Sequence, residues 1–259
     1  MLAQLQQGYA QMLDVSVERM RTPGLHVVVT PRRDQPEWAN WVHPVWFFKL
    51  EETVVCSVSP VYATKAKAVL AAVKLASLLD TDLLTVMQQI TAQQSTRGQS
   101  TTEQSATAVH PAEMEWVQCE LLYYPYASPP QLSSQHVVEN LQPTDDNVRG
   151  LLRLFDGGVY GIRAEDGTIA AHGCIKDKGL VHEIAVGTEV AYRQRGMGKA
   201  VVAAAVAQIL ERGKVPVYWP DSLQNLASYR LAYALGFQKA AEMLFCCYAL
   251  PDWAGFPLA

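Results

Sequence analysis

Residues 181–210, VHEIAVGTEVAYRQRGMGKAVVAAAVAQIL, constrain the fold more than any other stretch of the chain. The stretch begins as a strand and ends as a long apolar helix. Between the two lies a glycine-rich elbow, residues 193–200, with the sequence RQRGMGKA. A helix that begins at such an elbow directs several unpaired backbone N–H groups, and the positive end of its dipole, at one point. This arrangement predicts an anion site, and phosphate is the usual anion.

The residue types of the elbow suit a phosphate ligand. Gly196 and Gly198 carry no Cβ, so a ligand can approach the backbone closely. Arg193, Arg195 and Lys199 add positive charge on a chain whose net charge is −4. The elbow is therefore a local basic feature of an acidic protein, which argues against a general nucleic-acid binder.

Two common phosphate-binding motifs do not fit the elbow. A Walker loop needs glycine where Arg193 stands, and serine or threonine where Ala200 stands. A dinucleotide fingerprint needs glycine at the position of Val201. The remaining pattern is R-x-x-G-x-G, for which a surface turn with incidental arginines is the alternative interpretation.

The composition predicts a globular, cytoplasmic protein. Of the 259 residues, 49% are hydrophobic and 18% are charged, which suits one large or two ordinary domains with a sizeable core. No apolar run reaches the roughly 18 residues that a membrane span needs. The N-terminal residues lack the basic start and continuous apolar centre of a signal peptide.

The five cysteines predict neither disulfides nor a metal site. They show no C-x-x-C spacing, and three of them lie in apolar, strand-like runs. Cys246 and Cys247 are adjacent, so on a strand they point to opposite faces and are poor joint ligands. We interpret all five as reduced and buried; they are residues 56, 119, 174, 246 and 247.

A polar segment predicts the domain boundary. Residues 93–110 are rich in serine, threonine and glutamine and cannot bury a core. We therefore expect a smaller α+β domain over residues 1–112 and a second domain over residues 113–259. In the first, residue patterns predict helices over 2–21, 63–79 and 81–90, and strands over 25–30, 45–50 and 53–58.

The residue pattern of the second domain predicts a mixed α/β sheet. Three strands joined by tight turns precede the elbow, and a further strand should lie parallel to the third of them, because a helix connects the two. The expected elements are a short strand at 137–141, a helix at 147–155, strands at 158–164, 168–176 and 180–186, a helix at 196–212, a strand at 215–219, a helix at 225–235 and a strand at 243–250.

From about residue 137 to residue 250 the sequence resembles the GNAT superfamily of acyl-CoA N-acyltransferases. Two motifs occur in the right order, separated by one helix, one strand and the start of a second helix, and the chain looks closest to a bacterial subfamily with an extra N-terminal domain. The resemblance implies a mixed, mostly antiparallel GNAT-type sheet with flanking helices. The residues that carry it are Arg193, Gly196 and Gly198, then Asn225 and Ser228, and the ending Leu235-Gly236-Phe237.

The resemblance implies acetyl-CoA, or another short acyl-CoA, as co-substrate, with no metal. It implies that the backbone of Ala185 and Val186 pairs with the pantetheine amides, and that Asn225 and Ser228 contact the pantetheine or the pyrophosphate region. It further implies a pyrophosphate site beside Arg193, formed by the backbone N–H groups of Gln194, Arg195, Gly196, Met197, Gly198 and Lys199.

The expected reaction needs a base and an acid. An amine attacks the thioester carbonyl and a thiolate leaves, so the amine must lose a proton. Glu183 is the candidate base, with a solvent-facing residue on a hairpin edge as the alternative; His182 points to the opposite face and is interpreted as structural. Ala232 stands where many GNAT enzymes have tyrosine. Tyr233 is therefore the candidate acid, with a packing aromatic as the alternative.

We expect an N-acyltransferase that moves an acetyl or other short acyl group from coenzyme A to a primary amine within a ternary complex. The acceptor is a small molecule or a peptide, and neither a nucleic acid nor a membrane is an expected partner; a homodimer is left open. The alternatives are a non-catalytic acyl-CoA-binding sensor or scaffold and an interaction protein without a cofactor. The sequence does not set the acceptor or the acyl-chain length.

Overall fold

The chain forms two compact units. Unit 1 comprises Met1–Met12 and Cys119–Ala241, and unit 2 comprises Leu13–Gln118 and Glu242–Ala259. The expected boundary at 112/113 lies close to the observed one at 118/119. However, the N-terminal segment Met1–Met12 belongs to unit 1, and the C-terminal segment from Glu242 belongs to unit 2. The computed structural model describes residues 1–38, 41–73, 83–92, 114–132, 136–142 and 148–250.

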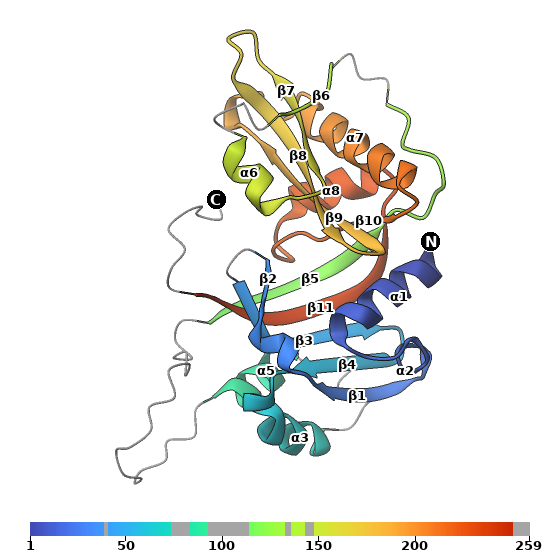
Figure 1. Cartoon of the computed structure of the whole chain (residues 1–259), viewed down its shortest axis with the longest axis vertical. Coiled ribbons are helices and arrows are strands. Elements are labelled where there is room, and N and C mark those ends of the chain that lie inside the picture. The colour runs from blue at the N-terminus through green and yellow to red at the C-terminus, as the bar shows by residue number, and fades with distance from the viewer. Residues whose placement is uncertain (39–40, 74–82, 93–113, 133–135, 143–147, 251–259) are drawn as a thin grey trace. The chain divides into compact units, whose positions relative to one another are not determined.

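Unit 1 contains the three-strand meander that the sequence predicts. β7 (Gly158–Arg163), β8 (Ile169–Lys178) and β9 (Val181–Thr188) pair antiparallel in turn. β10 (Val215–Tyr218) pairs parallel to β9, as expected from the helix that joins them. Helix α7 (Met197–Glu211) runs alongside these strands in Figure 1 and packs against them.

β5 (Glu115–Tyr123) occupies a position that the sequence did not predict. The strand order through unit 1 is β11-β5-β10-β9-β8-β7-β6, where β6 is Glu139–Asn140 and β11 is Gln238–Ala249. β5 is antiparallel to β10 and lies between β10 and the strand that follows β10 in the chain. A strand from far upstream thus separates two strands joined by a single helix. Local patterns carry no information about such long-range pairing.

The two faces of the sheet in unit 1 carry different helices. α7 and α8 (Leu226–Ala234) pack on one face, where Ile184, Tyr218 and Leu122 belong to the same core cluster. Side chains alternate along a strand, so Val181 points to the opposite face from Ile184. There it meets α1 (Leu2–Leu13): a Cβ on Gly8 would lie 2.8 Å from Val181 Cγ1. We name these the helix face, with α7 and α8, and the α1 face.

Glycines follow the last residues of both α7 and α8. Gly213 (φ 68°) and Gly236 (φ 92°) adopt the left-handed conformation that follows many helices. Beyond them, the Lys214 N–H donates to Ile209 O (3.1 Å) and the Phe237 N–H to Ala232 O (3.1 Å). These bonds satisfy carbonyl groups that a helix end otherwise leaves unpaired. A short helix α6 (Arg149–Leu154) and a 3-10 turn η4 (Val190–Tyr192) complete the described helices of unit 1.

Unit 2 is a second α+β layer with its own core. Its strand order is β1-β4-β3-β11, with β1 parallel to β4 and β3 antiparallel to both β4 and β11. Helices α3 and α5 cover one face, where Phe47, Val86 and Leu244 share a buried cluster. The elements are α2 (Val17–Arg21), β1 (Gly24–Val29), η1 (Pro31–Asp34), β2 (Pro36–Trp38), β3 (Trp41–Leu50), β4 (Thr53–Val58), η2 (Pro60–Tyr62), α3 (Ala63–Ala71) and α5 (Leu83–Thr91).

Some expected elements differ in length. The helix expected over 2–21 is interrupted, because Asp14 has a positive φ of 57° and Ser16 starts a new helix by accepting a bond from Arg19 N (3.2 Å). α3 ends at Ala71, and the remaining residues to 79 lie largely outside the described part of the chain, as does the polar segment at 93–110. β6 and α6 are shorter than expected, and β11 begins earlier, at Gln238.

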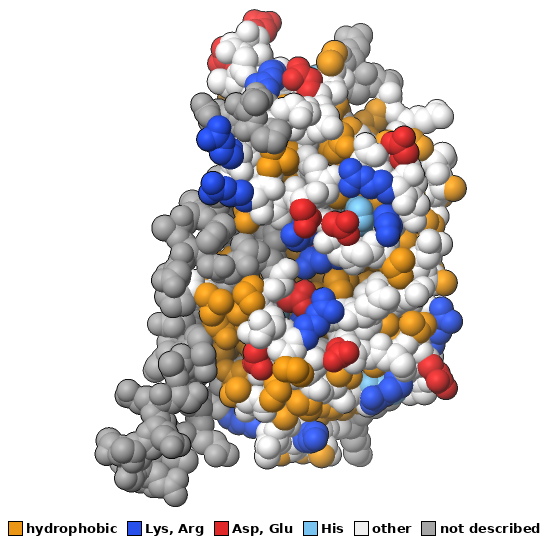
Figure 2. All heavy atoms as spheres, viewed as in Figure 1, with side chains coloured by type: hydrophobic (Ala, Val, Ile, Leu, Met, Phe, Trp, Pro, Cys, Tyr) orange, Lys and Arg blue, Asp and Glu red, His pale blue; other side chains and the backbone are white. Residues whose placement is uncertain are grey.

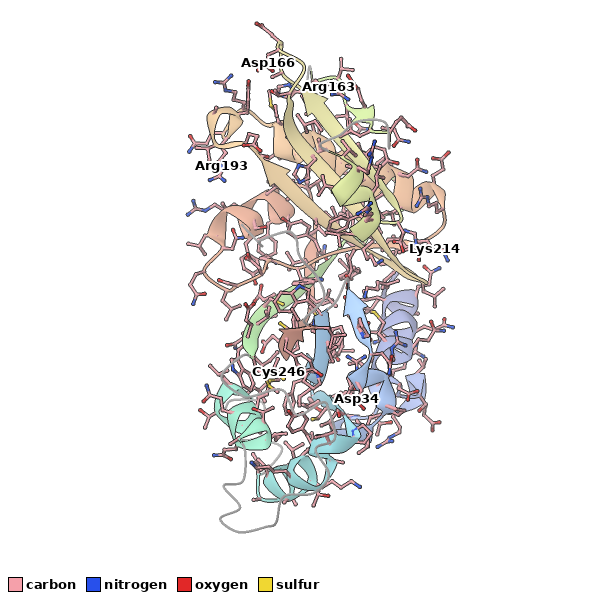
Figure 3. The ribbon with its side chains drawn as sticks, turned by 60° about the vertical axis from the view of Figure 1, so that its left-hand side comes forward. Asp34, Arg163, Asp166, Arg193, Lys214 and Cys246 are labelled. Atoms are coloured by element: carbon pink, nitrogen blue, oxygen red, sulfur yellow. The ribbon has the colours of Figure 1, made fainter. Side chains whose placement is uncertain are left out.

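All five cysteines are free and buried, as expected; Cys246 is labelled in Figure 3. Burial raises the pKa of the Cys174 and Cys246 thiols to about 12. No helix in the described residues is long and apolar enough to cross a membrane. Figure 2 shows acidic and basic side chains intermixed on the face in view, in keeping with the modest net charge of −4.

Two histidines, the half-buried His172 and the buried His182, predict a loss of stability in mild acid. Burial lowers the pKa of both His172 and His182 from 6.5, although Asp177 Oδ1 lies 3.2 Å from His182 Nε2. The unfolded chain therefore binds protons at a higher pH than the folded chain does. Stability is fully present above pH 6.5 and falls as the pH drops below it, by up to about 1.4 kcal/mol per pH unit for each histidine.

Urea unfolding at about pH 7.5 and about pH 5.5 measures this effect. The substitution His182→Asn should reduce the pH dependence, because asparagine does not titrate. An unfolding free energy that is equal at both pH values, or a slope that His182→Asn leaves unchanged, would contradict the prediction for His182.

Candidate active site

The strands β9 and β10 separate halfway along β9. They pair from Val181 with Val215 to Glu183 with Val217, and β10 ends at the next residue. β9 continues to Thr188. Among the described residues, this second half of β9 pairs with β8 and with no other strand. One edge of β9 is therefore open beyond Glu183.

The register shows which backbone groups face the open edge. The Val215 N–H donates to Leu180 O (3.1 Å) and the Glu189 N–H donates to Ala170 O (2.9 Å). Since backbone groups alternate in direction along a strand, even-numbered residues of β9 face β10 and odd-numbered residues face β8. The carbonyl of Ile184 and both backbone groups of Val186 thus lie on the open edge.

The backbone of Ala185 faces β8, contrary to expectation. It pairs with Cys174 of β8, and its N–H and C=O point toward that strand rather than toward the open edge. The expectation that Ala185 and Val186 both offer their backbone to a ligand is wrong for Ala185. Two neighbouring residues of one strand cannot both direct these groups to the same side.

The elbow brings the chain from β9 to α7 through two residues of positive φ. Gln194 (φ 63°) and Gly196 (φ 81°) both lie in the left-handed region, and glycine adopts it without strain. α7 begins at Met197, and no side chain caps it. Its first backbone bond runs from Ala200 N to Gly196 O (3.1 Å). The N–H groups before that bond therefore point out of the helix end; they belong to Met197, Gly198 and Lys199.

Gly198 allows a close packing that any larger residue would disturb. A Cβ there would lie 3.1 Å from Leu231 Cδ1 of α8 and 3.2 Å from Thr188 Oγ1 of β9. The helix end, the end of β9 and the side of α8 thus pack closely against one another at this glycine. The uncapped end of α7 fits a phosphate group.

The arginines of the elbow are exposed and held at its rim. Arg193 is labelled in Figure 3. Its Nε donates to Thr188 O (3.2 Å), which holds the side chain against the end of β9. The Arg195 guanidinium lies 5.4 Å from the centre of the Tyr192 ring. His136 Nε2 lies 2.8 Å from Arg195 O, a contact from a loop that the sequence did not connect with the elbow.

Glu183 lies at the point where the two strands separate. It is half-buried on an internal strand with Lys176 of β8 and Val217 of β10 on either side, so the alternative of a residue on a hairpin edge is wrong. Its side chain points to the α1 face, as Val181 does. There Tyr9 of α1 has its pKa raised, first by burial and then by the Glu183 carboxylate. No pattern in the sequence indicates that α1 packs near this residue.

Tyr233 lies over β5 rather than at the opening between β9 and β10. Its hydroxyl donates to Glu120 Oε2 of β5 (2.9 Å), and Lys239 Nζ binds the other oxygen of that carboxylate (2.8 Å). Burial and the bond to Glu120 raise the pKa of Tyr233. The structure therefore does not bring Tyr233 together with Glu183.

Asn225 and Ser228 connect α8 to its surroundings. Asn225 caps the helix: its Oδ1 accepts from Ser228 N (3.2 Å), and its Nδ2 donates to Asp221 Oδ1 (3.0 Å). The Ser228 hydroxyl lies 2.5 Å from the hydroxyl of Tyr218, the last residue of β10. These contacts give both residues a structural role at the opening, and Tyr218 is a polar residue of the site that the sequence analysis missed.

A profile described as GNAT acetyltransferase matches residues 160–244, from β7 into β11. No curated protein matches the chain. A protein from Novosphingobium aromaticivorans assigned to the GNAT family is 20% identical, with 56% of this chain and 71% of that chain covered and a TM-score of 0.45. The GCN5-related N-acetyltransferase from Kribbella flavida is 19% identical, with 54% and 61% covered and a TM-score of 0.41.

The protein yncA from Salmonella typhimurium, solved with its cofactor acetyl-CoA, is 16% identical. The similarity covers 49% of this chain and 100% of that chain, with a TM-score of 0.36. The profile match includes β9, the elbow and both helices of the site, and it confirms the resemblance stated from the motifs. Residues 160–244 therefore match a GNAT acetyltransferase domain.

Proposed function

We propose that this protein transfers an acetyl or other short acyl group from coenzyme A to a primary amine on a small molecule or a peptide. One observation carries the proposal: the open edge of β9 runs directly into the uncapped N-terminus of α7. An extended chain with two amides can pair with such an edge, and a pyrophosphate can bind such a helix end. Coenzyme A has both groups in this order: the pantetheine is an extended chain with two amides, and the pyrophosphate follows it.

The proposed contacts follow from this order. The pyrophosphate binds the backbone N–H groups between Gln194 and Lys199, with Arg193 and Arg195 at the rim. The pantetheine amides pair with Val186, and the thioester lies near the point where β9 and β10 separate. Asn225 and Ser228 hold α8 against this path.

The proposed reaction is direct transfer in a ternary complex. The amine nitrogen forms a bond to the thioester carbonyl carbon, the carbon–sulfur bond breaks, and the sulfur leaves with its electron pair. Glu183 takes the proton that the amine loses. A carboxylate at the opening also attracts the ammonium form of the acceptor. No covalent intermediate on the protein is needed, since holding two reactants together supplies much of the rate gain.

Donor binding is tested by isothermal titration of acetyl-CoA into the wild-type protein and Gly198→Val. Valine crowds Leu231 and Thr188 and displaces the start of α7 from β9, so we expect the affinity to fall about 10- to 100-fold, or about 1.4–2.8 kcal/mol. Ala207→Val is the matched control, because it adds a branched side chain further along α7. Release of the CoA thiol with a panel of amines then tests transfer.

The titrations and the amine panel distinguish the proposal from its alternatives. A wild-type protein that does not bind acetyl-CoA would overturn it. Binding that Gly198→Val and Ala207→Val weaken equally would place the donor elsewhere. Binding without turnover of any amine in the panel would instead favour an acyl-CoA sensor or scaffold.

A further inference from the structure

Tyr218 is the last residue of β10, where that strand parts from β9. Its neighbour Val217 is the partner of Glu183, and directly opposed residues in a sheet share a face. Tyr218 therefore points to the other side, the helix face, and it belongs to the buried cluster of α7 and α8. The carboxylate of Glu183 and the phenol of Tyr218 thus leave the sheet at the same point, on opposite faces.

The hydroxyl of Tyr218 is held against α8. It lies 2.5 Å from Ser228 Oγ, and the ring lies 6.0 Å from that of Phe237. Ala232 is one helical turn beyond Ser228 on the same side of α8, and it is fully buried in the same cluster. The side of α8 next to the opening therefore carries a small apolar residue, and the tyrosine of the facing strand supplies a hydroxyl there.

The other tyrosines of this cluster direct their hydroxyls elsewhere. Tyr229 accepts a bond from Glu120 N of β5 (3.0 Å), and Tyr124 donates to Ser128 O (3.0 Å). Tyr160, on β7, donates to Gln208 Oε1 of α7 (3.0 Å). Tyr218 is thus the cluster tyrosine that belongs to a strand bordering the opening.

We propose that the Tyr218 hydroxyl donates the proton that the coenzyme A thiolate takes up as it leaves. The inference rests on the proposed function and adds to it the identity of the acid. As the carbon–sulfur bond breaks, the sulfur keeps the electron pair and the Tyr218 O–H bond gives up its proton. The products are the N-acyl amine and the CoA thiol; Glu183 is then protonated and Tyr218 ionised, and solvent returns the proton from one to the other.

The surroundings of Tyr218 suit a proton donor. Burial raises its pKa, and the bond to Ser228 opposes this effect. The phenol therefore carries its proton at neutral pH. Ser228 fixes the direction of the hydroxyl, so it is a positioning residue rather than a group that contacts the sulfur.

The decisive measurement uses bound coenzyme A and does not require the acceptor. A phenol that donates to the sulfur stabilises the thiolate, so Tyr218→Phe should raise the pKa of the bound CoA thiol. Ultraviolet absorbance of the thiolate follows this pKa, and subtracting the desulfo-CoA complex removes the contribution of the protein's tyrosines. With an amine that the wild type acetylates, kcat should fall about 10- to 100-fold while the affinity for acetyl-CoA stays within about twofold.

Tyr160→Phe is the matched control, since it removes a buried hydroxyl of the same cluster that also bonds a helix side chain. It should leave both the thiol pKa and kcat at wild-type values, and Ser228→Ala should shift both partway. Equal thiol pKa values in wild type and Tyr218→Phe would overturn the inference, as would a shift caused by Tyr233→Phe alone. Failure of the wild type to bind coenzyme A would instead show that the proposed function is wrong.

Discussion

Glu183→Gln should lower kcat by about 10²- to 10⁴-fold, the usual contribution of a positioned general base. Glutamine keeps the size of the side chain but cannot take the proton that the attacking amine must lose. The affinity for acetyl-CoA should stay within about twofold, because Glu183 points to the α1 face while the helix-end contacts lie at the elbow. Steady-state rates with an accepted amine, together with titration of acetyl-CoA, separate the two effects.

Glu165→Gln is a suitable control for this change, since Glu165 is an exposed carboxylate in the β7–β8 turn. It changes the net charge by the same amount and should leave the rate unaltered. Thermal unfolding of both variants shows whether the fold is kept. If Glu183→Gln turned over as fast as the wild type, Glu183 would not be the base.

The elbow could be predicted because its parts are neighbours in the sequence. The positive φ of Gly196, the start of α7 at Met197 and the cap at Asn225 are all local consequences of residue type. The parallel pairing of β9 and β10 follows from one connecting helix. Contiguous motifs therefore predicted the uncapped helix start and the crossover.

The proposed catalytic residues depend on contacts between distant parts of the sequence. Tyr9 reaches Glu183 because α1 packs on β9, and no pattern in residues 2–13 indicates that. β5 enters between β10 and β11, and it provides the Glu120 carboxylate that holds Tyr233. The sequence identified a tyrosine on α8 as the acid, but the hydroxyl beside the opening comes from the facing strand.

The register of β9 sets a further limit on what the sequence can predict. The sequence placed the open edge at the correct strand, but which residues face it depends on the register with β8 and β10. Shifting that register by one residue would exchange the roles of Ala185 and Val186. Register is fixed by partner strands and by packing, so it became known only from the structure.

Glu37→Ala should lower the free energy of unfolding by about 3–5 kcal/mol, the usual cost of breaking a buried ion pair. Arg33 Nη2 lies 2.7 Å from Glu37 Oε1, and the two side chains are 0% and 5% exposed. The Arg33 guanidinium also lies 5.1 Å from the Trp46 ring, which fixes it within unit 2. Burial lowers the pKa of Arg33 and the Glu37 carboxylate opposes this shift, so removing Glu37 leaves a buried charge without its carboxylate.

A surface pair in the same unit provides the comparison. Lys49 Nζ lies 3.2 Å from Glu242 Oε2 with side chains 19% and 41% exposed, so Glu242→Ala should cost no more than about 1 kcal/mol. Urea unfolding measures both variants. The double change of Arg33 to Met and Glu37 to Leu should be less destabilising than Glu37→Ala, because no charge is left in the interior. If the two single variants lost equal stability, the Arg33–Glu37 pair would not depend on burial for its effect.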